Sequence, residues 1–206
     1  MYDYENALFS RGVRFICGVD EVGRGPLAGP VVAGAVILNP EIMIDGLNDS
    51  KQLTEKQREK LAVMIERNAL AYAVHFVDPK VIDEVNIYQA SKLAMIEAIR
   101  KLSIVPEHIL SDAMPLQEAG VPYTAIIKGD TLSASIAAGS IIAKVARDHF
   151  MVEMANLYPG YGFEKHKGYP TKAHIEALRS LGTTPIHRKS YKPVKDVLEN
   201  QLSLNL

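Results

Sequence analysis

Residues 23–29, Gly-Arg-Gly-Pro-Leu-Ala-Gly, separate two apolar runs rich in β-branched residues, Val13–Val19 and Pro30–Leu38. Such runs bounded by Gly and Pro are typical of strands, so we predict two strands joined by a tight loop. A dinucleotide-binding turn would need a helix directly after the glycines. Pro26 and the second strand pattern follow instead, which favours a loop that lies against a polymeric substrate, with Arg24 near phosphate.

The rest of the chain mixes helical and strand patterns. Thr54, with Gln57 three residues later, fits a capping box at the start of a helix, and Ser133–Met154 is a long helical pattern rich in Ala and Ile. Further strands are expected at Leu70–Val77, His108–Ser111 and Tyr123–Lys128, and further helices from Asp78-Pro79 and at Tyr88–Leu102, Thr171–Leu181 and Val194–Ser203. This order predicts an α/β fold in one domain over residues 1–206, with a basic, helical C-terminal region from residue 155 onward.

Composition excludes several classes of protein. With 48% apolar and 23% charged residues, the chain is neither disordered nor a coiled coil. Cys17 is the only cysteine, so neither an intramolecular disulfide nor a cysteine cage for a metal can form. The N-terminus lacks a secretory signal pattern, and no run approaches the roughly 18 apolar residues of a membrane helix. We therefore expect a cytoplasmic protein without membrane contact, with a monomer as the default.

The net charge of −1 conceals a basic stretch. From Tyr158 to Lys195, eight Lys and Arg residues stand against two Glu residues, a local net charge of +6. Such a stretch suits a polyanionic partner, although an ordinary solvated face has the same composition. Asp196 and Glu199 follow just beyond it.

Carboxylates stand at the ends of three predicted strands. Asp20-Glu21 closes the first strand, Asp112 the fourth and Asp130 the fifth, and ligands gather at such ends in open α/β sheets. Clustered carboxylates repel one another unless a cation neutralises them, and hard oxygen ligands favour Mg²⁺ or Mn²⁺. Two such ions can support hydrolysis of a phosphodiester. Aspartates at strand ends are also common as helix caps and turn residues, so the residues alone leave both interpretations open.

Four blocks, in this order, resemble the ribonuclease HII family. They are Gly18–Val32, which contains Asp-Glu-Val-Gly-Arg-Gly, then Asn48–Lys51, then the stretch from Ile127-Lys128-Gly129-Asp130 to Lys144-Val145-Ala146-Arg147-Asp148, then His166–Thr171. The match covers roughly residues 15–174. It implies a ribonuclease H-like mixed five-stranded sheet flanked by helices. It also implies that a two-ion site for Mg²⁺ or Mn²⁺ is formed by the catalytic carboxylates Asp20, Glu21, Asp112 and Asp130.

The resemblance further implies an endoribonuclease that cuts the RNA strand of RNA/DNA hybrids and the 5′ side of ribonucleotides embedded in duplex DNA, leaving 3′-hydroxyl and 5′-phosphate ends. The backbone of Gly23, Arg24 and Gly25 is expected to contact the 2′-hydroxyl group, and Tyr169 to pack on the neighbouring deoxyribose. The expected phosphate ligands are Lys51, Lys128, Lys165 and Lys167. The ribonuclease HIII type shares the sheet but carries an N-terminal substrate-binding domain, and only about 15 residues precede the first motif here.

The C-terminal residues resemble the short peptides that bacterial replication and repair proteins insert into the sliding clamp. The matching residues are Gln201, Leu202, Leu204 and Leu206, and the end of an amphipathic helix is the alternative. Two other functions compete with the ribonuclease: a DNA endonuclease with the same carboxylates, and a non-catalytic binder of hybrids. The Gly-Arg-Gly loop and Tyr169 argue against the first, and the four carboxylates argue against the second.

Overall fold

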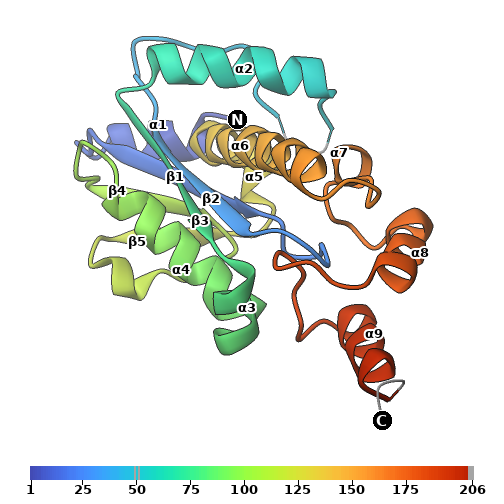
Figure 1. The fold of residues 1–206 in the computed structure, drawn as a ribbon. Coiled ribbons are helices and arrows are strands. Elements are labelled where there is room, and N and C mark those ends of the chain that lie inside the picture. The colour runs from blue at the N-terminus through green and yellow to red at the C-terminus, as the bar shows by residue number, and fades with distance from the viewer. Residues whose placement is uncertain (49, 51, 204–206) are drawn as a thin grey trace. The chain divides into compact units, whose positions relative to one another are not determined.

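The computed structural model describes residues 1–48, 50 and 52–203, with the backbone alone over 201–203 (Figure 1). The strands are β1 Ile16–Val22, β2 Val31–Ile37, β3 Ala71–Val77, β4 His108–Asp112 and β5 Tyr123–Ile126. The helices are α1 Asp3–Phe9, α2 Glu55–Asn68, α3 Pro79–Val85, α4 Ile87–Arg100, the 3₁₀ helix Gln117–Ala119, α5 Gly129–Leu132, α6 Ala134–Leu157, α7 Phe163–His166, α8 Lys172–Leu181 and α9 Lys192–Ser203. None of these described helices has the length and apolarity that a membrane span requires.

The chain forms two compact units. The first comprises Met1–Val22, Val32–Phe76 and Ser91–Ala146, and the second comprises Gly23–Val31, Val77–Ala90 and Arg147–Leu206. Nearly all of the sheet therefore belongs to the first unit, whereas the glycine-rich loop after β1 belongs to the second.

The first unit is built on a five-stranded sheet with the order β3-β2-β1-β4-β5. Strand β1 pairs antiparallel with β2, which places Asp20 opposite Gly34, and pairs parallel with β4, which in turn pairs parallel with β5. This arrangement confirms the predicted mixed sheet. Helix α6 lies on one face of the sheet and α4 on the other (Figure 1).

Glycines let α6 approach the central strands closely. A Cβ atom on Gly18 of β1 would lie 1.9 Å from the carbonyl carbon of Ser135 in α6. A Cβ atom on Gly34 of β2 would lie 2.3 Å from the carbonyl oxygen of Gly139, also in α6. Because side chains alternate along a strand, Asp20 faces the same side of the sheet as Gly18, toward α6.

Apolar side chains from α2, β2 and α6 fill the core on this side of the sheet. Buried members of this cluster include Val36 of β2, Leu61 and Ile65 of α2, and Ile141 and Ile142 of α6. The helical spacing of Leu61 and Ile65 explains why α2 lays one face on this core. The predicted capping box is confirmed at the start of α2, since the side chains and amides of the two capping residues bond reciprocally.

The observed strand ends differ from the predicted ones mainly in β1, which is shifted from Val13–Val19 to Ile16–Val22, and in β5. Strand β1 starts at Ile16 rather than Val13, because the amides of Arg14 and Phe15 donate to the side chain of Glu107 instead of to a neighbouring strand. Strand β5 ends at Ile126, because the chain turns at Ile127-Lys128, where Lys128 has a φ of 57°. Helix α1 was not predicted.

The second unit has its own apolar clusters. Leu27 of the glycine-rich loop packs with Leu178 of α8 and with Val194 and Val197 of α9. The next residue, Ala28, is buried against Met151 of α6 and against Tyr161 and Phe163. The loop therefore supplies core residues to this unit, which explains why it belongs there.

Candidate active site

Three aspartates of the first unit converge. Oxygen atoms of Asp20, Asp112 and Asp130 all lie within 4.8 Å of one another, and Asp20 and Asp130 are buried. Asp112 lies at the end of β4, as predicted, whereas Asp20 lies within β1, which continues to Val22 instead of ending at Asp20-Glu21. The prediction that Asp130 directly ends a strand was wrong, because Asp130 lies in α5, after the turn that follows β5.

Backbone amides orient two of these side chains. The Oδ1 atom of Asp20 accepts a hydrogen bond of 2.7 Å from the amide of Glu21, and Oδ1 of Asp112 accepts one of 2.7 Å from the amide of Gly129. Glu21 follows Asp20 on β1, but among the described residues it is not part of the group within 4.8 Å. Its role as a fourth ligand stays a prediction.

The charges around Asp20 indicate that the cluster suits a cation. Burial raises the pKa of Asp20 well above its usual value, and the nearby carboxylates of Glu21, Asp112 and Asp130 raise it further. Ionised carboxylates at this spacing repel one another, and a divalent cation offsets the repulsion. Because the donors are hard oxygen atoms, this set of residues fits Mg²⁺ or Mn²⁺.

Two serines support Asp20 in a way that the sequence analysis missed. A hydrogen bond from Ser140 of α6 counteracts the rise in the pKa of Asp20. The Ser140 and Ser50 hydroxyl oxygens lie 2.9 Å apart, and both residues are buried. When Asp20 is ionised it can only accept, so Ser140 then donates to Asp20 and accepts from Ser50. The signal was Ser140, a polar residue flanked by Ala, Gly and Ile residues in α6.

In the second unit, the glycine-rich loop is fixed by backbone hydrogen bonds. The amide of Leu27 donates to the Gly168 carbonyl, and that of Gly29 donates to the Ile186 carbonyl, each at 2.8 Å. The amide of Arg188 donates to the Leu27 carbonyl, also at 2.8 Å. The loop that contains Gly23, Arg24 and Gly25 is therefore held at its C-terminal side by two separate segments of this unit.

Tyr169 lies beside this loop. A Cβ atom on Gly25 would lie 3.6 Å from Cε1 of Tyr169, which is ordinary van der Waals contact. The tyrosine side chain is 39% exposed, while its backbone is fixed: its amide donates to the His166 carbonyl at 2.9 Å. Tyr169 thus offers an exposed ring on a rigid backbone, next to Gly25.

A chain of histidines also fixes the Tyr169 backbone, and the sequence analysis missed it. Nδ1 of His174 lies 2.9 Å from the Tyr169 carbonyl oxygen and must therefore carry a proton. Nδ1 of His187 accepts from the Thr184 amide at 2.9 Å, so its Nε2 carries the proton and donates to Nε2 of His174 at 3.2 Å. The network is satisfied only when both rings are neutral. Burial lowers the pKa of both, that of His187 to about 4.

The predicted phosphate ligands are spread over the chain. Lys128 and Lys165 are exposed, while Lys167 is partly buried and its ammonium group donates to the Glu164 carbonyl. Lys128 and Lys167 both have a left-handed backbone, with φ values of 57° and 50°. Lys51 lies outside the described residues.

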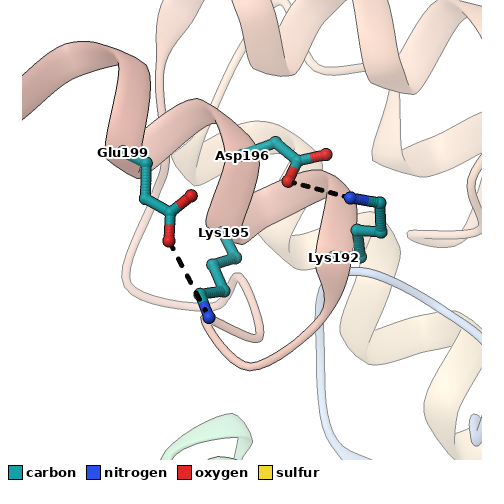
Figure 2. Close-up of polar contacts among 4 residues, drawn as sticks. All are labelled: Lys192, Lys195, Asp196 and Glu199. Atoms are coloured by element: carbon teal, nitrogen blue, oxygen red, sulfur yellow. Dashed lines mark hydrogen bonds and ion pairs between the residues drawn. The ribbon is translucent and has the colours of Figure 1, made fainter. Parts of the chain in front are cut away.

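The basic stretch is less positive on its surface than its sequence indicates. Arg188 is fully buried. Lys192 and Lys195 of α9 form ion pairs with Asp196 and Glu199, at 3.4 and 3.8 Å (Figure 2). These exposed pairs contribute little to stability, but they neutralise part of the charge of α9. Gln201 and Leu202 belong to the last turn of that helix, and Leu204–Leu206 lie outside the described residues.

The family model and the similar proteins that match this chain agree on one family. The family model described as ribonuclease HII matches residues 17–194. A ribonuclease HII from Bacillus cytotoxicus is 55% identical over 202 residues, which cover 98% of this chain and 78% of that protein.

Solved structures also match the chain. The ribonuclease H2 of Pyrococcus horikoshii OT3 matches with a TM-score of 0.78 at 31% identity, covering 90% of this chain and 97% of that one. A chain from the PCNA:RNase HII complex of Archaeoglobus fulgidus matches with a TM-score of 0.73 at 28% identity, covering 86% of this chain and 95% of that one. These matches confirm the predicted ribonuclease H-like fold.

Proposed function

Because the chain belongs to the ribonuclease HII family and is a metal-dependent ribonuclease, we propose that it cuts the RNA strand of RNA/DNA hybrids and the 5′ side of ribonucleotides embedded in duplex DNA. The products are a 3′-hydroxyl and a 5′-phosphate end. The observation that carries the proposal is the cluster of Asp20, Asp112 and Asp130, whose oxygen atoms lie within 4.8 Å of one another.

The residues that would hold the metal are these three aspartates together with Glu21, and we propose two Mg²⁺ or Mn²⁺ ions when substrate is bound. When bound, such ions supply charge stabilisation at the scissile phosphate and activation of the attacking water. The chain itself contributes a fixed geometry. Asp20 is held on a central strand by the Glu21 amide, and Asp112 is held by the Gly129 amide.

Recognition of the ribonucleotide is assigned to the second unit. Backbone groups of Gly23, Arg24 and Gly25 are proposed to contact the 2′-hydroxyl, the group that distinguishes RNA from DNA. The ring of Tyr169 is proposed to pack on the sugar of the next deoxynucleotide. The exposure of this ring and its position next to Gly25 support that assignment.

Phosphate contacts are proposed for the four lysines, Lys51, Lys128, Lys165 and Lys167. These contacts carry no sequence information, so the enzyme is expected to act on many sequences. Because the ion pairs of α9 reduce the surface charge of the second unit, we expect only moderate binding to all-DNA duplexes.

The decisive experiment uses a labelled DNA duplex that contains one ribonucleotide, an all-DNA duplex and a long RNA/DNA hybrid. Each is incubated with Mg²⁺, with Mn²⁺ and with EDTA, using the wild type and Asp20→Asn. We expect cleavage 5′ to the ribonucleotide and within the hybrid, only with metal and only by the wild type. The all-DNA duplex should remain intact.

The other outcomes separate the alternatives. Cleavage of the hybrid alone would remove the activity at single ribonucleotides. Cleavage of all-DNA duplexes would favour the related DNA endonuclease. Tight binding of hybrids without any cleavage would favour the non-catalytic binder.

We also propose that the C-terminal residues bind a bacterial sliding clamp through Gln201, Leu202, Leu204 and Leu206. The A. fulgidus relative, whose solved structure is a complex with PCNA, supports an association of this kind. A glutamine followed by leucines at alternate positions can lie extended and fill apolar pockets.

The clamp proposal is tested with a fluorescent peptide of residues 201–206 and a control peptide in which the leucines are alanines. Saturable binding of the first peptide alone to a purified bacterial clamp is the expected result. Equal or absent binding of both peptides up to high micromolar concentration would refute it.

A further inference from the structure

Two arginines of the second unit are fully buried. Among the described residues, Arg147 and Arg188 are the largest side chains with 0% exposure. Burying a guanidinium group is unfavourable unless its N–H donors have acceptors, so each buried arginine must be hydrogen-bonded to nearby groups. Most of these acceptors are main-chain carbonyl oxygens of the loop that follows β1.

Arg147 joins this loop to the turn that carries Tyr169. Its Nε and Nη2 atoms donate to the carbonyls of Pro30 and Ala28, at 3.0 and 3.1 Å. Its Nη1 atom donates to the carbonyl of Lys167 at 3.0 Å. One planar group thus fixes the distance between two segments that are far apart in the sequence.

Gly23 makes room for this guanidinium group. A Cβ atom on Gly23 would lie 2.3 Å from Nε of Arg147, and the φ of Gly23 is 95°, a value that glycine adopts without strain. The first glycine of the Gly-Arg-Gly segment is therefore required by the arginine beneath it as well as by the backbone conformation.

Arg188 binds both ends of the loop. Its Nη2 atom donates to the Gly23 carbonyl at 2.5 Å, and its Nη1 atom donates to the Arg24 carbonyl at 2.9 Å. Its Nε atom donates to the Gly29 carbonyl at 3.0 Å. The hydroxyl of Tyr191 accepts from Nη1 at 3.0 Å and itself donates to the Arg24 carbonyl at 2.6 Å.

These bonds determine the direction of two amides. In a trans peptide, the carbonyl of one residue and the amide of the next point in opposite directions within one plane. Since Arg188 holds the carbonyls of Gly23 and Arg24, the amides of Arg24 and Gly25 point away from its guanidinium group. These amides belong to the backbone proposed above to meet the 2′-hydroxyl.

The chain directly after Arg188 is also fixed. Asp83 of α3 accepts from the amides of Lys189 and Ser190, each at 2.9 Å, and from the Ser190 hydroxyl at 2.6 Å. Arg188 thus reaches the loop from a rigid turn.

We propose that Arg188, with Tyr191 and Arg147, is a positioning residue for ribonucleotide recognition: it orients the Gly23–Gly25 backbone so that the enzyme prefers a ribonucleotide to a deoxynucleotide. This inference rests on the proposed function. Lysine cannot replace Arg188 in this role, because one ammonium group does not match the planar fork that reaches three carbonyls. Burial and the nearby charge of Arg188 together lower the pKa of Arg147 to about 10, which still leaves Arg147 charged at neutral pH.

The test compares affinities, so that cleavage does not obscure the result. Fluorescence anisotropy in Ca²⁺, used as a non-catalytic ion, gives the affinity for a duplex with one ribonucleotide and for the matching all-DNA duplex. We expect Arg188→Lys to lower the ratio of the two affinities about tenfold, with little change in all-DNA binding. The exposed Arg179→Lys on α8 is the matched control and should keep the wild-type ratio.

Tyr191→Phe provides a milder variant in case Arg188→Lys does not fold. It removes one hydroxyl from a partly buried residue and should lower the affinity ratio about threefold. An unchanged ratio in both folded variants, or in Tyr191→Phe if Arg188→Lys is unfolded, would overturn the inference. If the wild type itself shows neither preference for the ribonucleotide nor cleavage next to it, the proposed function fails, and the inference fails with it.

Discussion

The Nε2 atoms of His174 and His187 lie 3.2 Å apart, and both rings are buried in the second unit. The hydrogen bond between them needs one protonated and one unprotonated Nε2 atom. The Tyr169 carbonyl requires a proton on Nδ1 of His174, and the Thr184 amide requires an unprotonated Nδ1 on His187. Adding a proton to either ring removes an acceptor that the network uses. The backbone of Tyr169 is therefore coupled to the protonation of two histidines that are distant from the carboxylates in sequence.

This network predicts acid sensitivity. The pKa of His187 is about 4 in the folded chain, against an ordinary value of 6.5, so the unfolded chain takes up the proton first as the pH falls. The stability that the neutral ring contributes is complete above about pH 6.5 and is lost as the pH falls toward 4. Urea unfolding should show a loss of about 2 kcal/mol between roughly pH 7.5 and 5.

The variant His187→Gln, which cannot titrate, is the control for acid sensitivity. It should be less stable than the wild type at neutral pH, because it loses hydrogen bonds, yet lose less stability on acidification. An equally steep loss in this variant would assign the acid sensitivity to other groups.

Asp20→Asn should separate metal binding from folding. Removing a buried charge that three carboxylates repel should raise the melting temperature in EDTA by about 2–4 °C. Adding Mn²⁺ should raise the melting temperature of the wild type, because an ion that binds only the folded state stabilises it, and the variant should show a much smaller rise. Asp196→Asn, which alters only an exposed ion pair of α9, should behave as the wild type in both conditions (Figure 2).

Gly18→Ala should be severely destabilising. The added methyl group would overlap the Ser135 backbone, and neither β1 nor α6 can move without disturbing the sheet. We expect a loss of about 3 kcal/mol in the free energy of unfolding. Gly12→Ala, where nothing lies within 4 Å and only a φ of 85° is strained, should lose about 1 kcal/mol. Similar losses in both variants would contradict the proposed close packing.

Tyr169→Ala should reduce cleavage at a single embedded ribonucleotide about tenfold, because it removes the exposed ring that we propose packs on the substrate. Tyr169→Phe keeps the ring and should retain most of the activity, since Tyr169 bonds to His166, Thr171 and His174 through its backbone. The comparison of kcat/KM for the two variants measures the contribution of the ring. A larger loss in the phenylalanine variant would assign the role to the hydroxyl instead.

Much of the fold could be predicted because its signals are local. Glycines between β-branched runs, the capping box at Thr54 and the apolar stretch of α6 each depend on residues close together in the chain. The elements followed from these signals, while their ends did not. Strand β1 starts late because distant Glu107 binds its first amides, and β5 ends early because Lys128 takes a left-handed conformation.

The sequence by itself determined the family and the mixed sheet, because these depend on residue type and order, and it predicted the three aspartates that the structure brings together. Only the tertiary structure decided which serines hydrogen-bond around Asp20 and which loop carbonyls Arg147 and Arg188 bind. Ser50 and Ser140 are distant in sequence, and Arg188 is counted as a surface charge until its burial is known. Hydrogen bonds between distant segments depend on where the backbone carbonyls and hydroxyls come together, and no local pattern in the sequence encodes that.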